Sequence, residues 1–174
     1  ADLVVPTGLD FSGYDFAAAG EPHRFDDYAV GERIDHVDGV TLTESEHQQA
    51  TRLWQNTAKV HFNKEARPDG RNLVYGGHVI SMARALSFNG LANAQLVAAI
   101  NAGAHTAPAF AGDTVYAWSE VLDKAETSVP SVGALRLRLV ATKGRDESMT
   151  LRGEDGKYAE GVLLDLDYWA LIPR

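Results

Sequence analysis

Proton-transfer chemistry is suggested by an asparagine and a histidine in the stretch QNTAKVHF, residues 55–62. Asn56 precedes His61 by five residues, and no Asp or Glu lies between them. An imidazole can move a proton near neutral pH, whereas an amide can orient a water molecule but cannot accept its proton. The pair therefore predicts a site in which His61 is the general acid/base and Asn56 places the water. The alternative is that His61 is an ordinary packed histidine.

A glycine pair, Gly76 and Gly77, begins a segment with helical periodicity. A helix N-terminus exposes unpaired N–H groups and a partial positive charge, so it can bind an oxygen that gains negative charge. His78 follows directly, as a substrate contact and a rival to His61 for the catalytic role. The glycines could instead only permit a tight helix entry. From Gly76 to Asn101 there is no Asp or Glu, so an acid/base group must come from upstream, which favours His61.

The sequence lacks the residues that several other kinds of catalysis and binding require. The 174-residue chain has no cysteine, which excludes disulfides and thiolate catalysis, and its six histidines form no HExxH motif, so we expect no metal. Motifs of serine hydrolases and P-loop NTPases do not occur. The net charge of −8 argues against nucleic acid, and no apolar run is long enough for a membrane span. A cytoplasmic location is the expectation. His47 is expected on a helix surface and His105 at a strand end.

The elements that must hold these residues follow from the periodicity. Residues 1–24, rich in Gly and Pro among scattered apolar side chains, predict an arm that lies along the body or a partner. Residues 43–55 predict a helix with Thr43 as N-cap and Glu46 completing a capping box. Its apolar face would be Ala50, Leu53 and Trp54.

A second helix is predicted over residues 76–88, where apolar residues recur at i, i+3, i+4 and i+7. From residue 95 onward, segments of period two separated by turn residues predict antiparallel strands. The result is an α+β plan in which a curved sheet wraps around one central helix, over residues 25–174. The buried stripe of that helix is expected to be Val79, Met82, Ala83 and Leu86.

This order of motifs resembles the MaoC-like hydratases of the hotdog superfamily. The resemblance rests on FDDYAVGE (25–32), TLTESE (41–46), the segment ending at His61, YGGHVISMARAL (75–86) and PAFAGDTV (108–115). It covers residues 24–172, one hotdog unit. More closely, RLWQNTAKVHF and LVYGGHVISMARALSFNGLANA are similar to the second half of the tandem-hotdog hydratases that act on mesaconyl-CoA. The resemblance implies that this chain is a C-terminal half and that residues 1–24 connect the halves.

The resemblance implies reversible hydration of an enoyl-CoA thioester by a lyase without a metal or a separate cofactor, since coenzyme A belongs to the substrate. The thioester oxygen would lie at Gly76 and Gly77. The family pairs an Asp with a histidine five residues later, and here Asn56 takes the place of that Asp. The partner would be a second copy in a homodimer, or an N-terminal hotdog half. Cations that could hold a substrate carboxylate or the phosphates of coenzyme A are Arg52, Lys59, Arg71 and Arg84.

Two other functions remain open at this point. A hotdog thioesterase would activate water at the thioester carbonyl, against which the absence of carboxylates on the second helix counts. A non-catalytic hotdog would only bind acyl-CoA or complete a partner's site, which the amide of Asn56 favours.

Overall fold

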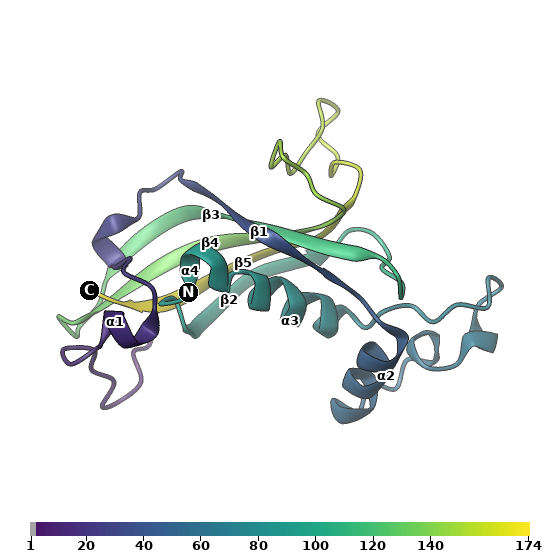
Figure 1. Ribbon diagram of the computed structural model, residues 1–174, viewed down its shortest axis with the longest axis horizontal. Helices are drawn as coiled ribbons and strands as arrows, with labels where there is room; N and C mark the ends of the chain where they lie inside the picture. The colour runs from purple at the N-terminus through teal and green to yellow at the C-terminus, as the bar shows by residue number, and fades with distance from the viewer. Residues whose placement is uncertain (1–2) are drawn as a thin grey trace.

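The computed structural model describes residues 3–174 and contains one five-stranded antiparallel sheet, ordered β1-β3-β4-β5-β2. Figure 1 shows the strands side by side, and β1 and β2 are the two edge strands of the sheet. The strands are β1 (Arg33–Thr41), β2 (Leu96–His105), β3 (Thr114–Glu126), β4 (Val132–Lys143) and β5 (Val162–Pro173).

Helix α3 (Gly76–Leu86) lies along the concave face of this sheet (Figure 1). Its side chains Val79, Ala83 and Leu86 are buried against the inner face of the strands, while Met82 is partly buried beside them. Burying the apolar stripe of the helix and one face of the sheet in a common core is the main stabilising contribution of this layer. The predicted central helix and the α+β hotdog plan are confirmed.

The outer face of the sheet is covered at both ends by segments without long elements. At one end, apolar residues of the arm (Leu3, Val5, Leu9 and Phe11) pack on Val132, Ala134, Trp169 and Leu171. At the other end, residues 144–161 pack Met149, Leu151 and Tyr158 on Trp118, Val140 and Val162. Residues 3–24 therefore lie along the body, and their one short helix is α1 (Phe16–Ala19).

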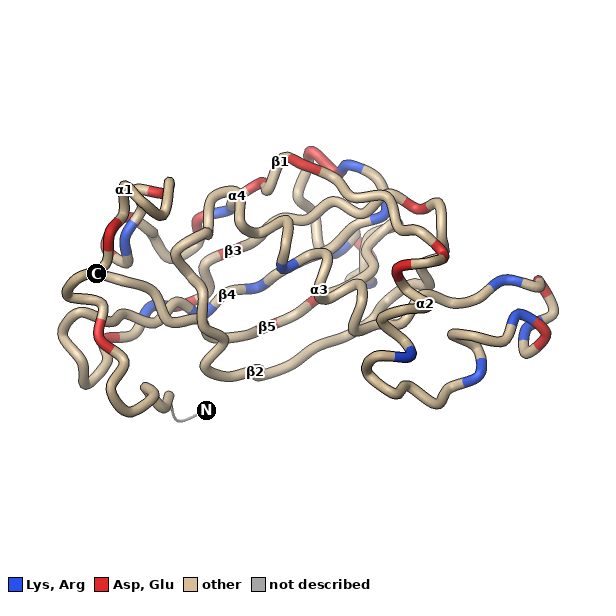
Figure 2. The backbone as a smooth tube through the Cα atoms, turned by 60° about the horizontal axis from the view of Figure 1, so that its bottom comes forward, with Lys and Arg blue, Asp and Glu red and all other residues tan. Residues whose placement is uncertain are grey.

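The remaining helices are short and lie mostly at the ends of the sheet (Figure 1). No helix within residues 3–174 has the length and apolar character needed to cross a bilayer. Figure 2 shows Lys and Arg along β4 and along the segment that follows α2, rather than gathered on one face. The remaining short helices are α2 (Glu44–Leu53), α4 (Phe88–Leu91) and three 3₁₀ turns, η1 (Phe25–Asp27), η2 (Lys59–His61) and η3 (Lys64–Ala66).

Helix α2 buries the opposite face from the one that the sequence predicts. Thr43 is its N-cap and accepts from the Glu46 N–H at 3.3 Å, as expected. However, Leu53 is 75% exposed and Trp54 67% exposed, whereas His47 and Thr51 are buried. The predicted apolar face of α2 is therefore wrong. The helix lies beyond the end of the central core and contacts the molecule through polar side chains.

A buried histidine ties β1 to the neighbouring segments. The Nδ1–H of His36 donates to the Asn89 carbonyl at 2.7 Å, and its Nε2 accepts from the Ser119 hydroxyl at 2.8 Å. Acceptance through Nε2 requires a neutral ring, whereas the Nδ1–H bond is kept in either form. Burial lowers the pKa of His36, although its bond to Asn89 opposes this.

Stability is therefore expected to fall with acidification. Because the pKa of His36 is lower in the folded than in the unfolded state, the unfolded chain gains its proton first as the pH drops below about 6.5. We expect the free energy of unfolding, measured with urea between pH 7.5 and 5, to fall with decreasing pH in the wild type. This fall is expected to be steeper than in His36→Gln by up to about 1.4 kcal/mol per pH unit. Parallel slopes would contradict this role of the imidazole.

Candidate active site

A cleft of about 690 Å³ opens at the N-terminal end of α3. Three segments meet there: the turn that follows α2, the start of α3 with the residues just before it, and the end of β2 with the loop that follows. Its lining combines His61 and Asn56 with Gly76 and Gly77, so four of the predicted site residues meet at one cleft. The other lining residues are Leu73, Val74, Tyr75, Val79, Ile80, His105, Thr106, Ala107, Pro108 and Ala109.

Asn56 reaches the cleft because of the way α2 ends. Gln55 adopts a left-handed conformation (φ 52°), its N–H bonds the Arg52 carbonyl at 3.1 Å, and the Asn56 N–H bonds the Thr51 carbonyl at 2.9 Å. This is the paired hydrogen-bond pattern of a Schellman motif, which reverses the chain sharply after a helix. The Oδ1 atom of Asn56 then accepts from the Ala58 N–H at 2.9 Å. With its oxygen bound, Asn56 has its Nδ2 donors free for a ligand.

His61 ends the 3₁₀ turn η2, and its ring is oriented by a backbone carbonyl. Its Nδ1 lies 2.8 Å from the Leu73 carbonyl oxygen. Since a carbonyl can only accept, Nδ1 carries the proton and Nε2 of the neutral ring keeps its lone pair. The ring also stands edge-on to Tyr75, with centroids 5.9 Å apart. Such a ring has the tautomer of a base that accepts a proton through Nε2.

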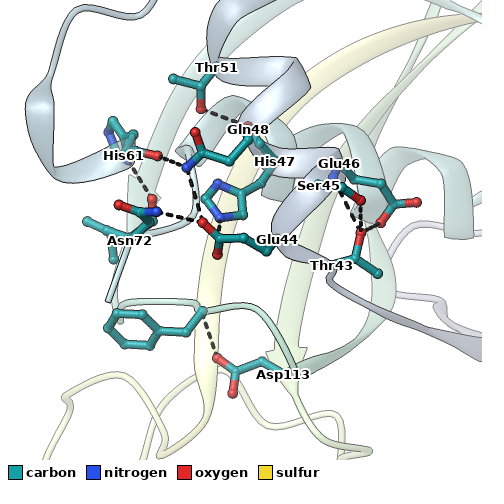
Figure 3. Close-up of polar contacts among 12 residues, drawn as sticks. Thr43, Glu44, Ser45, Glu46, His47, Gln48, Thr51, His61, Asn72 and Asp113 are labelled. Carbon is teal, nitrogen blue, oxygen red and sulfur yellow. Dashed lines mark hydrogen bonds and ion pairs between the residues drawn. The ribbon is translucent and has the colours of Figure 1, made fainter. Parts of the chain in front are cut away.

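Polar side chains of α2 fix the segment that carries His61 (Figure 3). Gln48 donates from Nε2 to the His61 carbonyl at 2.6 Å. Glu44 accepts from Asn72 at 2.6 Å and lies 3.0 Å from Nε2 of His47. His47 is fully buried, so its predicted position on the helix surface is wrong. These contacts explain why α2 faces inward with its polar side: this side binds residues 61–72.

The start of α3 presents its backbone to the cleft. Tyr75 is the N-cap, and the first amides of a helix, here those of Gly76 and Gly77, have no intrahelical acceptor. A Cβ on Gly76 would lie 2.5 Å from Nε2 of His105, and one on Gly77 would lie 2.6 Å from Cζ of Tyr75. Glycine at both positions therefore lets these two rings pack closely on the helix start, beside two backbone N–H donors.

His78 does not line the cleft, contrary to its predicted contact with substrate. Consecutive helical residues are turned by about 100°, so His78 leaves the side of α3 that Gly76 and Gly77 present. The ring is buried, with 7% of the residue exposed. Burial lowers the pKa of His78, Glu46 opposes this, and His47 adds to it. His78 is thus a neutral packed histidine between α2 and α3.

The four predicted cations lie in different places. Arg84 is in the last turn of α3, at the far end from the cleft, where it donates to Ser87 Oγ at 2.8 Å and to the Ala94 carbonyl at 3.2 Å. Arg52 and Lys59 are exposed outside the cleft lining. Arg71 is also exposed, and its guanidinium stacks 3.8 Å from the ring centroid of Phe110.

Two cleft residues escaped the sequence prediction as site residues. His105 was expected only as the end of a strand, which it is, and Tyr75 stands beside the glycine pair without a motif of its own. The order of the strands brings His105 to the start of α3, since β2 pairs with β5 at the sheet edge. No local pattern around residue 105 carries that information.

Comparison with known proteins gives close relatives at about twice this length, although no protein-family model matches the chain. The chain is 73% identical over all 174 residues to mesaconyl-CoA hydratase of Cereibacter sphaeroides and covers 51% of that protein. It is 56% identical over 180 aligned positions to beta-methylmalyl-CoA dehydratase of Chloroflexus aurantiacus, covering 99% of this chain and 51% of the relative. The chain thus spans about half the length of these relatives.

Solved structures agree with the fold. A protein of Chloroflexus aurantiacus described as a MaoC domain dehydratase superposes with a TM-score of 0.93 at 56% identity, over 99% of this chain and 51% of that one. A Mycobacterium tuberculosis protein with a double hotdog fold gives a TM-score of 0.63 at 24% identity, over 100% of this chain and 49% of that one, and supports the fold alone. The chain has the hotdog fold, and over nearly its full length it is similar to one half of proteins named mesaconyl-CoA hydratase, beta-methylmalyl-CoA dehydratase and MaoC domain dehydratase.

Proposed function

We propose that this unit is one half of a tandem-hotdog hydro-lyase, the C-terminal half by the resemblance of its sequence, that interconverts mesaconyl-CoA and β-methylmalyl-CoA. The observation that carries the proposal is the cleft itself, in which the imidazole of His61 and the free amides of Gly76 and Gly77 line one space of acyl-chain size. The relatives named for these two substrates support the choice of acyl group.

The reaction divides among these groups as follows. Nε2 of His61 takes a proton from water while the water oxygen bonds to the β-carbon, and the electron pair of the double bond moves to the thioester oxygen. The Gly76 and Gly77 amides stabilise that oxygen, each by about 3 kcal/mol. The imidazolium of His61 then returns the proton to the α-carbon. Water is added in full, and the reaction requires no metal and no cofactor besides the coenzyme A of the substrate.

Asn56 takes the place of an Asp because mesaconyl-CoA already carries a carboxylate on the carbon that water attacks. With Oδ1 bound to the Ala58 N–H, Asn56 directs N–H donors at the water or at that carboxylate. An Asp about 4 Å from the substrate carboxylate would repel it by about 4 kcal/mol at an effective dielectric of 20. The amide keeps the hydrogen bonding and removes the repulsion.

The phosphates of coenzyme A are proposed to lie near Phe110, which directly follows the cleft residues Pro108 and Ala109. Arg71 stacks on that ring, and Lys143 lies 5.9 Å from its centroid. Lys143 is already paired with Asp113 at 2.8 Å, so Arg71 is the preferred phosphate contact of the two. Arg84, bound within the core, is left out of this proposal.

Pairing with a second hotdog unit is proposed to occur through the edge strand β2. This strand pairs only with β5, and its Leu96, Val97 and Ile100 are 41%, 49% and 65% exposed. An uncovered edge strand with apolar side chains is a ready pairing surface. Separately, we propose a cytoplasmic location, because the sequence contains no cysteine.

Charging that strand is expected to separate the units. Ile100→Lys places a cation on the exposed side of β2, where it cannot be buried without a large desolvation cost. Sedimentation velocity is expected to show a shift to the smaller species for an assembly formed by separate chains, while Val30→Lys, at an exposed position outside the strand, is the matched control. For such separate chains, an unchanged sedimentation coefficient in Ile100→Lys would place the interface elsewhere.

The test of the function is the ultraviolet absorbance of the conjugated enoyl thioester. We expect the assembled protein, this unit with the unit it pairs with, to remove that absorbance with mesaconyl-CoA and much more slowly with crotonyl-CoA. Release of free thiol without loss of the enoyl group would indicate a thioesterase. Tight binding of acyl-CoA without either change would indicate a non-catalytic unit.

A further inference from the structure

The cleft contains a second imidazole, that of His105, at the end of β2. Its Nε2 lies so close to the start of α3 that a Cβ on Gly76 would be 2.5 Å away, with Cε1 at 2.9 Å and Cδ2 at 3.0 Å. These three similar distances place the face of the ring, at its Nε2 end, against the residue whose amide begins the helix. Of the titratable side chains that line the cleft, only His61, Tyr75 and His105 are present.

The surroundings of His105 favour a neutral ring. Partial burial is the cause that lowers the pKa of His105, and no carboxylate lines the cleft to oppose it. A neutral imidazole carries one N–H donor and one acceptor. An N–H donor on Nε2 would lie beside Gly76, in the cleft that Gly76 and Gly77 also line.

We propose that His105 is a further catalytic residue that donates from Nε2–H to the thioester oxygen, as a third donor beside Gly76 and Gly77. The inference rests on the proposed hydratase function and deepens it. Two backbone amides are fixed by the helix, whereas the third donor comes from the sheet, so the oxygen is held from two sides. A donor that acts on developing charge lowers the barrier more than it strengthens substrate binding.

The chain offers a matched pair of variants. In His105→Gln the terminal amide reaches the position of Nε2 and keeps a donor there, whereas the shorter side chain of His105→Asn does not. In the assembled protein we expect His105→Asn to lower kcat roughly 10²-fold with little change in KM, and His105→Gln to recover most of the loss. His23→Asn, at an exposed imidazole of the arm outside the cleft, controls for loss of a histidine as such.

A spectroscopic measurement separates a donor from a residue that only shapes the cleft. In a His61→Asn background, which holds the substrate unreacted, the infrared band of a ¹³C-labelled thioester carbonyl is expected to move to lower wavenumber on binding. Adding His105→Asn is expected to reverse part of that shift, and adding His105→Gln is not.

The outcomes distinguish the inference from the function on which it rests. If the wild type hydrates mesaconyl-CoA, and His105→Asn has the wild-type kcat and carbonyl band, His105 is not a donor and the hydratase function stands. If the wild type hydrates no enoyl-CoA, the function fails and the inference fails with it.

Discussion

Replacing His61 with Asn is expected to lower kcat for hydration of mesaconyl-CoA by about 10³-fold, within the range that general acid–base catalysis contributes. Asn is the informative choice because its Nδ2 can take the place of the ring Nδ1 and keep the 2.8 Å hydrogen bond to the Leu73 carbonyl. The variant thus loses the basic Nε2 while the backbone of residues 59–73 stays held. The measurement is the rate of absorbance loss at saturating substrate.

Two further measurements make this result decisive. The melting temperature of His61→Asn is expected to stay close to that of the wild type, since the structural bond is retained. Gly77→Ala supplies a contrast, because its added Cβ would meet the Tyr75 ring and is expected to disturb both the helix start and the rate. Hydration at the wild-type rate in His61→Asn would remove the imidazole from the mechanism and favour a unit that only binds acyl-CoA.

Asn56→Asp is expected to reduce kcat/KM for mesaconyl-CoA by up to about 10³-fold, the equivalent of about 4 kcal/mol of repulsion between two carboxylates. An Asp can still accept from the Ala58 N–H through one oxygen, as Asn56 does at 2.9 Å. Its second oxygen then replaces the Nδ2 donors with a negative charge. The substitution therefore changes charge with little change of shape.

The control for Asn56→Asp is a second substrate rather than a second variant. Crotonyl-CoA has no carboxylate on the attacked carbon, so the variant is expected to lose little activity toward it, and the ratio of the two kcat/KM values is expected to fall. If Asn56→Asp turned over both substrates like the wild type, electrostatic repulsion would not be the reason for an amide at this position.

The fold followed from sequence wherever one pattern determined the outcome. The stripe of Val79, Ala83 and Leu86 and the period-two segments from residue 95 predicted a helix wrapped by strands, because a helix with one apolar stripe and strands with one apolar face bury both by packing together. Thr43 marked the start of α2 for a local reason, the hydrogen bond to the Glu46 N–H.

The orientation of α2 could not be predicted from its own residues. Its apolar side chains Leu53 and Trp54 suggested the buried face, but Glu44, His47 and Gln48 have hydrogen-bond partners in residues 61–72, which are far from them in sequence. The same limit applies to His105, whose place beside Gly76 depends on the strand order.

The binding of the Asn56 oxygen to Ala58 has a consequence for inhibitors. With that oxygen engaged, Asn56 offers hydrogen donors to a bound acyl chain, as Gly76 and Gly77 do, while Nε2 of His61 offers an acceptor. A compound that fits should carry hydrogen-bond acceptors at both ends of the part that replaces the acyl group, where they meet these donors. Between them it should carry one acidic hydrogen that Nε2 of His61 can accept. A nitronate or hydroxamate attached to a pantetheine chain has this character, and an amine-bearing analogue does not.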